Sequence, residues 1–294
     1  MISLNKLIGS FLLLTVGVAS LFLSQYRKSS PIKGIIPSVC HNHAVEPSSQ
    51  ILTQLDQTFT YFAKGYDMYA FKSADGKSVL KIPRSKMKAS FWNTLLPKKW
   101  KNPKSKTSSE IEMSFLLARD YLKEQSQMLY LHFGKTNTGK TLTLIDRKNI
   151  RHTLALDSLP FYLQSFVPLF GDVVKESVSK NDLKAFKAQM GAFFEMVGVR
   201  HAKGLKKTDK MLWWKNYGYR EPGLVVEIDL GGIFHENGEY ISELDRYGAL
   251  IRKWVVENTT PEFIDAYDAE LEIAKQKSPQ EHLIHQKVRI SSLL

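Results

Sequence analysis

The chain is poor in cysteine, and this scarcity excludes several classes of protein. Its 294 residues include one cysteine, Cys40, so no internal disulfide can form. No Cys/His spacing matches a zinc site, although Cys40-His41-Asn42-His43 could bind a stray metal. The G-x-S-x-G elbow of a Ser/His/Asp hydrolase is also missing. The chain is 43% hydrophobic, which suits one large or two small lobes with real cores.

Acidic residues are missing from the most basic stretch. The formal net charge is +12, and Arg84–Lys106 carries eight basic residues and no acidic one, with Trp92 and Trp100 among them. Basic side chains beside Trp rings suit a membrane interface, where acidic headgroups meet the charge. A solvated loop is the alternative interpretation. Nucleic acid would attract the same charge but is the less favoured partner.

The N-terminal segment carries no charge over Leu7–Leu23, and basic residues follow it from Arg27 onward. We expect residues 1–26 to form a single-pass membrane anchor that keeps the globular part in the cytoplasm. The alternative is a signal segment cleaved near Val18-Ala19-Ser20, after which the protein would be secreted. Residues 27–50 are rich in Ser and Pro and are predicted to be a linker.

Strand patterns dominate the first part of the globular chain. Residues 57–84 predict three strands separated by turns at Lys64-Gly65 and Ala74-Asp75-Gly76. On the third, Ser78–Ile82, alternation puts Val79 and Lys81 on one face. Further strands are expected at 129–133, 141–145 and around 161–166.

Helical patterns dominate the remainder. A capping box at Ser109 and Glu112 predicts a helix to about residue 123. Apolar spacing predicts another from Lys180 to about Val197, and two more at 240–256 and 261–275, the last with Thr260 as its cap. The order predicts an α+β fold with two lobes, a β-rich one over 51–168 and a helical one over 169–294.

A complete Walker pattern, GKTNTGKT, spans Gly134–Thr141. A phosphate-binding loop would need a buried strand before it and a helix after it. Here the following residues alternate as a strand, so we expect a hairpin turn instead of a nucleotide site.

The strongest candidate for chemistry is Val225–Phe234, an apolar run that ends in Asp229 and two glycines. Asn216 lies upstream, separated from Asp229 by a polar turn and a strand. An amide and a carboxylate are oxygen ligands of the kind that Mg²⁺ prefers.

These features together resemble the protein-kinase-like superfamily over roughly Gln57–Trp254. The resemblance rests on a looped β-hairpin, a strand lysine in Val79-Leu80-Lys81, a helix with glutamates, a catalytic-loop-like segment and a DFG-like Asp229-Leu230-Gly231. It implies a bilobal kinase-like fold that binds ATP and Mg²⁺.

The same resemblance assigns roles to individual residues. Lys81 would contact the nucleotide phosphates, steadied by Glu110 or, preferably, Glu112. Residues 162–166, with Gln164 and Phe166, would form the hinge that pairs with adenine. Asn216 and Asp229 would hold Mg²⁺, and Asp209 would act in catalysis together with Lys81.

The chain departs from the family pattern in its catalytic loop. It has no His-Arg-Asp motif, Gly65 stands alone in the nucleotide loop, and Lys203, Lys206 and Lys207 precede Asp209. Those cations could stabilise transferred phosphate charge or mark a site that has lost transfer. The pattern is similar to divergent bacterial kinase-like proteins, including sugar- and lipopolysaccharide-kinase relatives. We therefore expect a membrane-anchored phosphotransferase acting on a sugar or lipid hydroxyl. The alternative is a pseudokinase acting as a binding or scaffold module.

Overall fold

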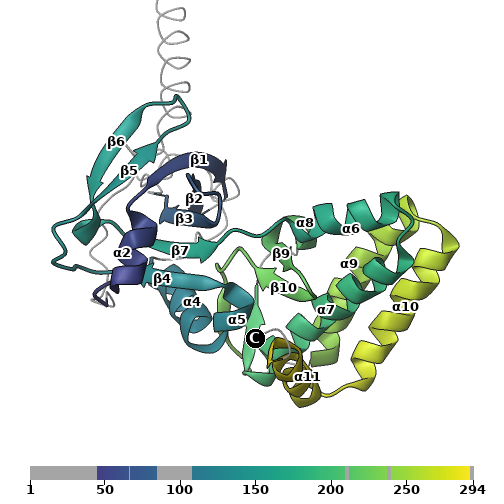
Figure 1. The fold of residues 1–294 in the computed structure, drawn as a ribbon. Helices are drawn as coiled ribbons and strands as arrows, with labels where there is room; N and C mark the ends of the chain where they lie inside the picture. The colour runs from purple at the N-terminus through teal and green to yellow at the C-terminus, as the bar shows by residue number, and fades with distance from the viewer. Residues whose placement is uncertain (1–44, 66, 85–107, 209–211, 237–239, 292–294) are drawn as a thin grey trace, which may run out of the picture. The chain divides into compact units, whose positions relative to one another are not determined.

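The computed structural model describes residues 45–65, 67–84, 108–208, 212–236 and 240–291 (Figure 1). The apolar N-terminal run, most of the expected linker, the basic segment 85–107 and Asp209 lie outside the described residues. Within the described ranges, no helix combines the length and the apolar character needed to cross a bilayer. The chain forms two compact units. The described residues within Met1–Pro103 and His132–Leu163 form one unit, and those within Lys104–Leu131 and Gln164–Leu294 form the other.

The first unit is built on strands. Its elements are α2 (Ser49–Leu55), β1 (Thr58–Lys64), β2 (Met68–Ser73), β3 (Ser78–Pro83), β5 (Thr141–Ile145), β6 (Arg151–Ala155) and the short 3₁₀ turn η3 (Leu156–Ser158). Two further strands, β4 (Met128–His132) and β7 (Phe161–Ser165), lie where the chain passes from one unit to the other. The sheet order is β4-β7-β3-β2-β1-β5-β6, so the three strands predicted over 57–84 are confirmed as a meander.

The β2–β3 turn shows why this part of the chain folds locally. Asp75 Oδ1 accepts hydrogen bonds from Ser73 Oγ at 2.6 Å and from Lys77 N at 3.0 Å. Gly76 supplies the left-handed backbone, with φ at +72°. The hydrogen bond from Ser73 and the one from Lys77 N also lower the pKa of Asp75. The predicted turn at Ala74-Asp75-Gly76 is confirmed.

The second unit is mainly helical and also contains two small sheets. Its elements are α4 (Ser108–Tyr121), α5 (Lys123–Ser126), α6 (Phe170–Ser179), α7 (Leu183–Ala202), β8 (Leu205–Lys207), α8 (Trp213–Asn216), β9 (Tyr217–Arg220), β10 (Leu224–Glu227), β11 (Ile233–His235), α9 (Tyr240–Asn258), α10 (Pro261–Gln276) and α11 (Pro279–Ser291). Strand β9 pairs with β10 and β8 pairs with β11, both antiparallel. The molecule is therefore mixed α and β, with a sheet and a helical C-terminal part.

Helix α7 is the centre of the second unit. Asp182 caps it by accepting a hydrogen bond from Ala185 N at 2.9 Å. The predicted apolar positions Phe186, Met190 and Phe193 are fully buried, and so is Phe194 on another side of the helix. Burial extends around α7 because α9, α10 and α11 all pack against it (Figure 1).

Several local expectations need correction. The helix expected to start at a Ser109 cap begins at Ser108, so Ser109 lies inside it. Thr260 precedes α10, with Pro261 at the helix start, but its hydroxyl bonds Glu262 and makes no capping hydrogen bond. Helices α6 and α11 and strand β6 have no counterpart in the sequence prediction.

The lobe boundary expected at residue 168 stays a prediction. In the described part of the chain, α4 and α5 group with the second unit, and Ser114 on α4 bonds residues on both sides of the Gly231-Gly232 turn.

Candidate functional site

The predicted pair Asn216 and Asp229 lies together at the open end of the β9–β10 hairpin. The strand register places Glu227 opposite Tyr217, so the chain enters and leaves the hairpin side by side. The carbonyl of Asn216 accepts hydrogen bonds from Ile228 N at 3.0 Å and from Asp229 N at 3.2 Å. The expected strand at 224–228 is confirmed, and the two residues are backbone neighbours, whereas their role as metal ligands stays a prediction.

Both side chains are accessible and offer oxygen donors. Asn216 is half-buried and Asp229 is exposed. Asp229 Oδ1 accepts a hydrogen bond from Gly231 N at 3.1 Å, which orients the carboxylate. An amide and an oriented carboxylate fit Mg²⁺, which usually retains several waters and substrate phosphate oxygens beside one or two protein ligands. No group of three or more His, Cys, Asp or Glu residues able to hold a metal occurs within the described ranges.

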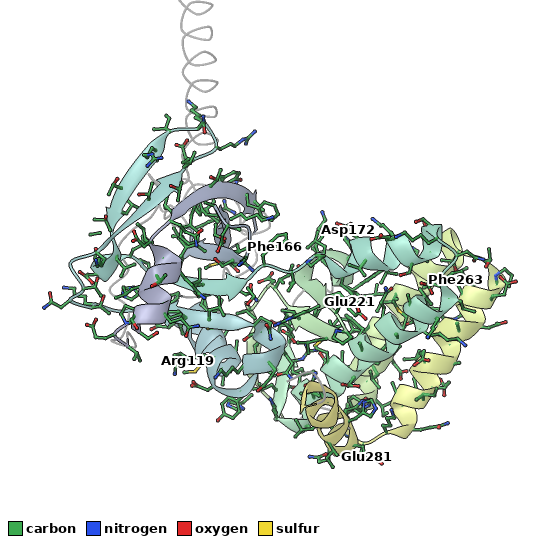
Figure 2. The ribbon with its side chains drawn as sticks, viewed as in Figure 1. Arg119, Phe166, Asp172, Glu221, Phe263 and Glu281 are labelled. Atoms are coloured by element: carbon green, nitrogen blue, oxygen red, sulfur yellow. The ribbon has the colours of Figure 1, made fainter. Side chains whose placement is uncertain are left out.

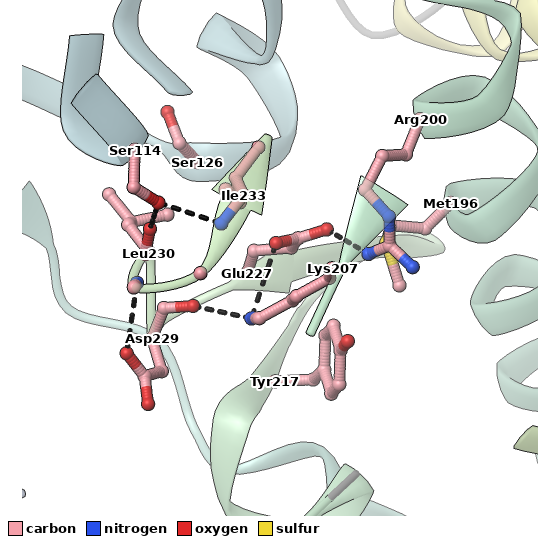
Figure 3. A network of polar contacts seen from close by, with 12 residues as sticks. Ser114, Ser126, Met196, Arg200, Lys207, Tyr217, Glu227, Asp229, Leu230 and Ile233 are labelled. Atoms are coloured by element: carbon pink, nitrogen blue, oxygen red, sulfur yellow. Dashed lines mark hydrogen bonds and ion pairs between the residues drawn. The ribbon is translucent and has the colours of Figure 1, made fainter. Parts of the chain in front are cut away.

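The turn after Asp229 is held from two sides. Ser114 Oγ donates to Leu230 O at 2.6 Å and accepts from Ile233 N at 2.7 Å (Figure 3). Thr208 N donates to Gly232 O at 3.0 Å. Gly232 adopts φ of +84°, a left-handed conformation that disfavours side chains with a Cβ. Thr208 is the last described residue before Asp209.

A buried ionic network lies beneath the hairpin. Arg200 on α7 is fully buried and binds Glu227 and, at 2.7 Å, Glu243. His201 binds the other oxygen of Glu243. Burial opposes the charged form of Arg200, but the carboxylates of Glu227 and Glu243 raise its pKa well above its usual value. Burial by itself would raise the pKa of the Glu243 carboxyl group, but Arg200 and His201 lower that pKa.

The lysines before Asp209 all make contacts within the second unit. Lys203 donates to the carbonyl of Tyr121, and Lys206 lies 3.6 Å from a carboxylate oxygen of Glu236. Lys207 is fully buried. It therefore does not face solvent, as a cation that stabilises transferred phosphate would have to. The sequence did contain a sign that one of these lysines is buried. Glu227 ends an apolar strand, and a buried carboxylate requires a cationic partner.

The expected hinge residues have different surroundings. Gln164 is buried, and its amide donates to Ser126 O at 2.5 Å and to Glu227 O at 2.9 Å. Its side chain therefore links α5 to β10. Phe166 is half-buried on the segment that joins β7 to α6 (Figure 2). Adenine pairing by this segment stays a prediction.

Lys81 and Glu112 belong to different units. Lys81 is half-buried on β3, and its ammonium lies 5.4 Å from the ring centre of Tyr162, within the range of a cation–π contact. Glu112 on α4 is buried, whereas Glu110 is exposed. The phosphate contact of Lys81 and its support by Glu112 stay predictions.

The Walker-like segment binds a carboxylate of its own chain. Thr136 Oγ1 and Thr138 Oγ1 donate to Asp157 Oδ1 at 2.6 and 2.7 Å, and Gly139 N donates to Oδ2 at 2.9 Å. The segment leads into β5 and not into a helix, so it is no phosphate-binding loop. The expected hairpin is also wrong, because β4 and β5 are not neighbours in the sheet.

Comparison with known proteins gives little. No family model matches the chain, and no curated protein matches it. A structure of the bifunctional kinase-methyltransferase WbdD is similar at 12% identity, over 75% of this chain and 47% of that chain, with a TM-score of 0.31. WbdD with the kinase inhibitor LY294002 is similar at 12% identity, over 80% and 50%, with a TM-score of 0.31. The chain spans about half the length of these proteins, and a similarity at this TM-score supports no conclusion about this chain.

Proposed function

We propose that the chain is a kinase-like phosphotransferase that binds Mg-ATP through Asn216 and Asp229. The observation that supports this is the backbone adjacency of the two residues at the end of the β9–β10 hairpin. One residue supplies an accessible amide and the other an accessible carboxylate, and both groups belong to the ligand chemistry of a magnesium–phosphate site. Bound Mg²⁺ would neutralise phosphate charge during transfer.

The remaining roles in the proposal come from the sequence. Lys81 would contact phosphate, and Asp209 would orient the acceptor hydroxyl. The apolar run Leu7–Leu23 and the basic segment Arg84–Lys106 favour an acceptor at a membrane, such as a sugar or lipid hydroxyl.

Nucleotide binding can be tested by thermal unfolding with and without Mg-ATP. Saturating Mg-ATP at about 100 times its Kd should stabilise the wild type by about 2.7 kcal/mol. Asp229→Ala and Asn216→Ala should lose this stabilisation, because each removes one oxygen donor. Chelating the Mg²⁺ should also reduce it in the wild type.

Asp265→Ala provides the matched control, since Asp265 is an exposed aspartate on α10 in the same unit. It should respond to Mg-ATP like the wild type. A wild type that Mg-ATP does not stabilise would sink the proposal, as would equal stabilisation of Asp229→Ala.

A binding module without transfer is the second candidate function. Lys207 favours it, because a buried lysine stands two residues before Asp209 in a chain without a His-Arg-Asp motif. Such a protein would still bind Mg-ATP but would not turn it over.

A further inference from the structure

Lys207 places a buried ammonium directly behind Asp229. Its Nζ lies 3.3 Å from Glu227 Oε2 and donates a hydrogen bond to the backbone carbonyl of Asp229 (Figure 3). The ring centre of Tyr217 lies 5.0 Å from the same nitrogen. Lysine has a compact charge with three donors, so one ammonium can hold a carboxylate and a carbonyl together.

The charges around Lys207 connect this contact to the helical core. Glu227 also binds Arg200 on α7, and Arg200 binds Glu243 on α9. The side chains of all four residues are fully buried, so each charge depends on its partners for compensation. The carbonyl of Asp229 is thereby connected, through Lys207, to the buried charges of the second unit.

The side chain of Asp229 points the other way from this anchor. Its carboxylate is exposed and is oriented by Gly231 N, while Lys207 holds the carbonyl of the same residue. Figure 3 shows the carboxylate of Asp229 directed away from Lys207 and Glu227. Lys207 can therefore fix where the carboxylate sits without touching a ligand bound to it.

We propose that Lys207 is a positioning residue, which holds the Asp229 turn in the geometry needed to bind a magnesium–nucleotide complex. The ligand part of this inference rests on the proposed function, whereas the ordering of the turn does not. Groups that orient a metal ligand from behind typically change metal affinity by about 10- to 100-fold when they are removed.

The direct variant, Lys207→Met, removes the anchor but leaves Glu227 short of a buried cation, and this could prevent folding. The double variant Lys207→Met/Glu227→Gln removes both charges and leaves the Arg200–Glu243 pair intact. Lys206→Met is the matched control, because Lys206 is on the same strand and binds Glu236 near the surface.

Two measurements separate ordering of the turn from ligand binding. Hydrogen–deuterium exchange of residues 228–233 is followed in the full chain without nucleotide, and ATP affinity is measured with Mg²⁺ and with EDTA. In the double variant, the turn should exchange at least about tenfold faster, because a hydrogen bond to a charged group is lost, while exchange in α10 is unchanged. Its affinity for ATP should fall about 10- to 100-fold with Mg²⁺ and little in EDTA. Lys206→Met should match the wild type in both measurements.

Unchanged exchange at 228–233 in a folded double variant would overturn the inference, whatever happens to affinity. Faster exchange with unchanged magnesium-dependent affinity would overturn the ligand part. If the turn loosens but wild-type protein shows no magnesium-dependent ATP binding, the proposed function fails and the ordering role of Lys207 stands.

Discussion

Asp157 is the residue around which the Walker-like segment is organised. Burial alone would raise the pKa of this carboxyl group, but hydrogen bonds from Thr136, from Thr138 and from Gly139 N lower it below its ordinary range. A loop rich in glycine, threonine and backbone donors suits any anion, and here the anion is a side chain of the same unit. The Walker pattern alone could not show which anion it binds.

Asp157→Asn should therefore destabilise the protein by about 2 kcal/mol at pH 7, because charge-assisted hydrogen bonds are lost. A depressed carboxyl pKa contributes stability fully above the unfolded value of about 3.9, and this contribution is lost as the pH falls below it. The difference from wild type should thus shrink below about pH 4. Denaturant unfolding of both proteins at several pH values measures this difference in the free energy of unfolding.

Asp56→Asn is the matched control, since Asp56 is an exposed carboxylate in the same unit. A constant difference between Asp157→Asn and wild type from pH 7 down to about pH 3 would contradict the assignment.

Helix α11 packs against α7 at Gly198, where the absence of a side chain leaves room for His282. A Cβ built on Gly198 would lie 2.4 Å from Cδ2 and 2.8 Å from Cβ of His282, so the whole His282 side chain would have to move. His282 is buried, lies 2.6 Å from the hydroxyl of Tyr240, and has its pKa lowered by that burial. The position of α11 depends on the missing side chain of Gly198.

Gly198→Ala should cost about 1–3 kcal/mol through overpacking and should speed amide exchange in α11. Gly191→Ala on the same helix is the control. A Cβ there would meet only the carboxylate end of Glu270, at 2.9 Å, and this flexible end can move. If amide exchange in α11 is as slow in Gly198→Ala as in the wild type, the missing side chain of Gly198 does not determine how α11 packs on α7.

At the scale of the whole molecule, the candidate chemistry is divided between the two units. Lys81 belongs to the β-rich unit, whereas Asn216, Asp229 and the Lys207 network belong to the helical unit. In the helical unit, the Asp229 turn is supported by the buried Lys207 network. Nucleotide binding and phosphoryl transfer therefore need separate tests, and the proposed transfer is tested on the full chain.

Transfer can be distinguished from binding alone by ATP turnover of the full chain in lipid vesicles. A phosphotransferase should consume Mg-ATP, and Asp209→Asn should reduce kcat by at least about 100-fold, as expected for a lost acid–base group, while Mg-ATP still binds. Asp265→Asn should leave turnover unchanged. Binding without turnover in the wild type would establish the binding module, and unchanged turnover in Asp209→Asn would remove Asp209 from the mechanism.

The sequence by itself determined the local elements and one part of the site. The β1–β3 meander and α7 follow from alternation, turn residues and helical spacing, which act over a few positions. The sequence alone could predict that Asn216 and Asp229 lie near each other, because a single short hairpin separates them.

Only the tertiary structure decided which polar groups are buried and what they hold. The Thr136–Asp157 contact, the bonds of Ser114 to Leu230 and Ile233, and the Lys207–Asp229 bond join residues that are 21 to 119 positions apart. Local propensity carries no information about such partners. One of the three lysines that precede Asp209, Lys207, thus has its charge compensated by Glu227 inside the helical unit. The physical reason is that burial of a charge depends on which distant carboxylate the fold brings to it.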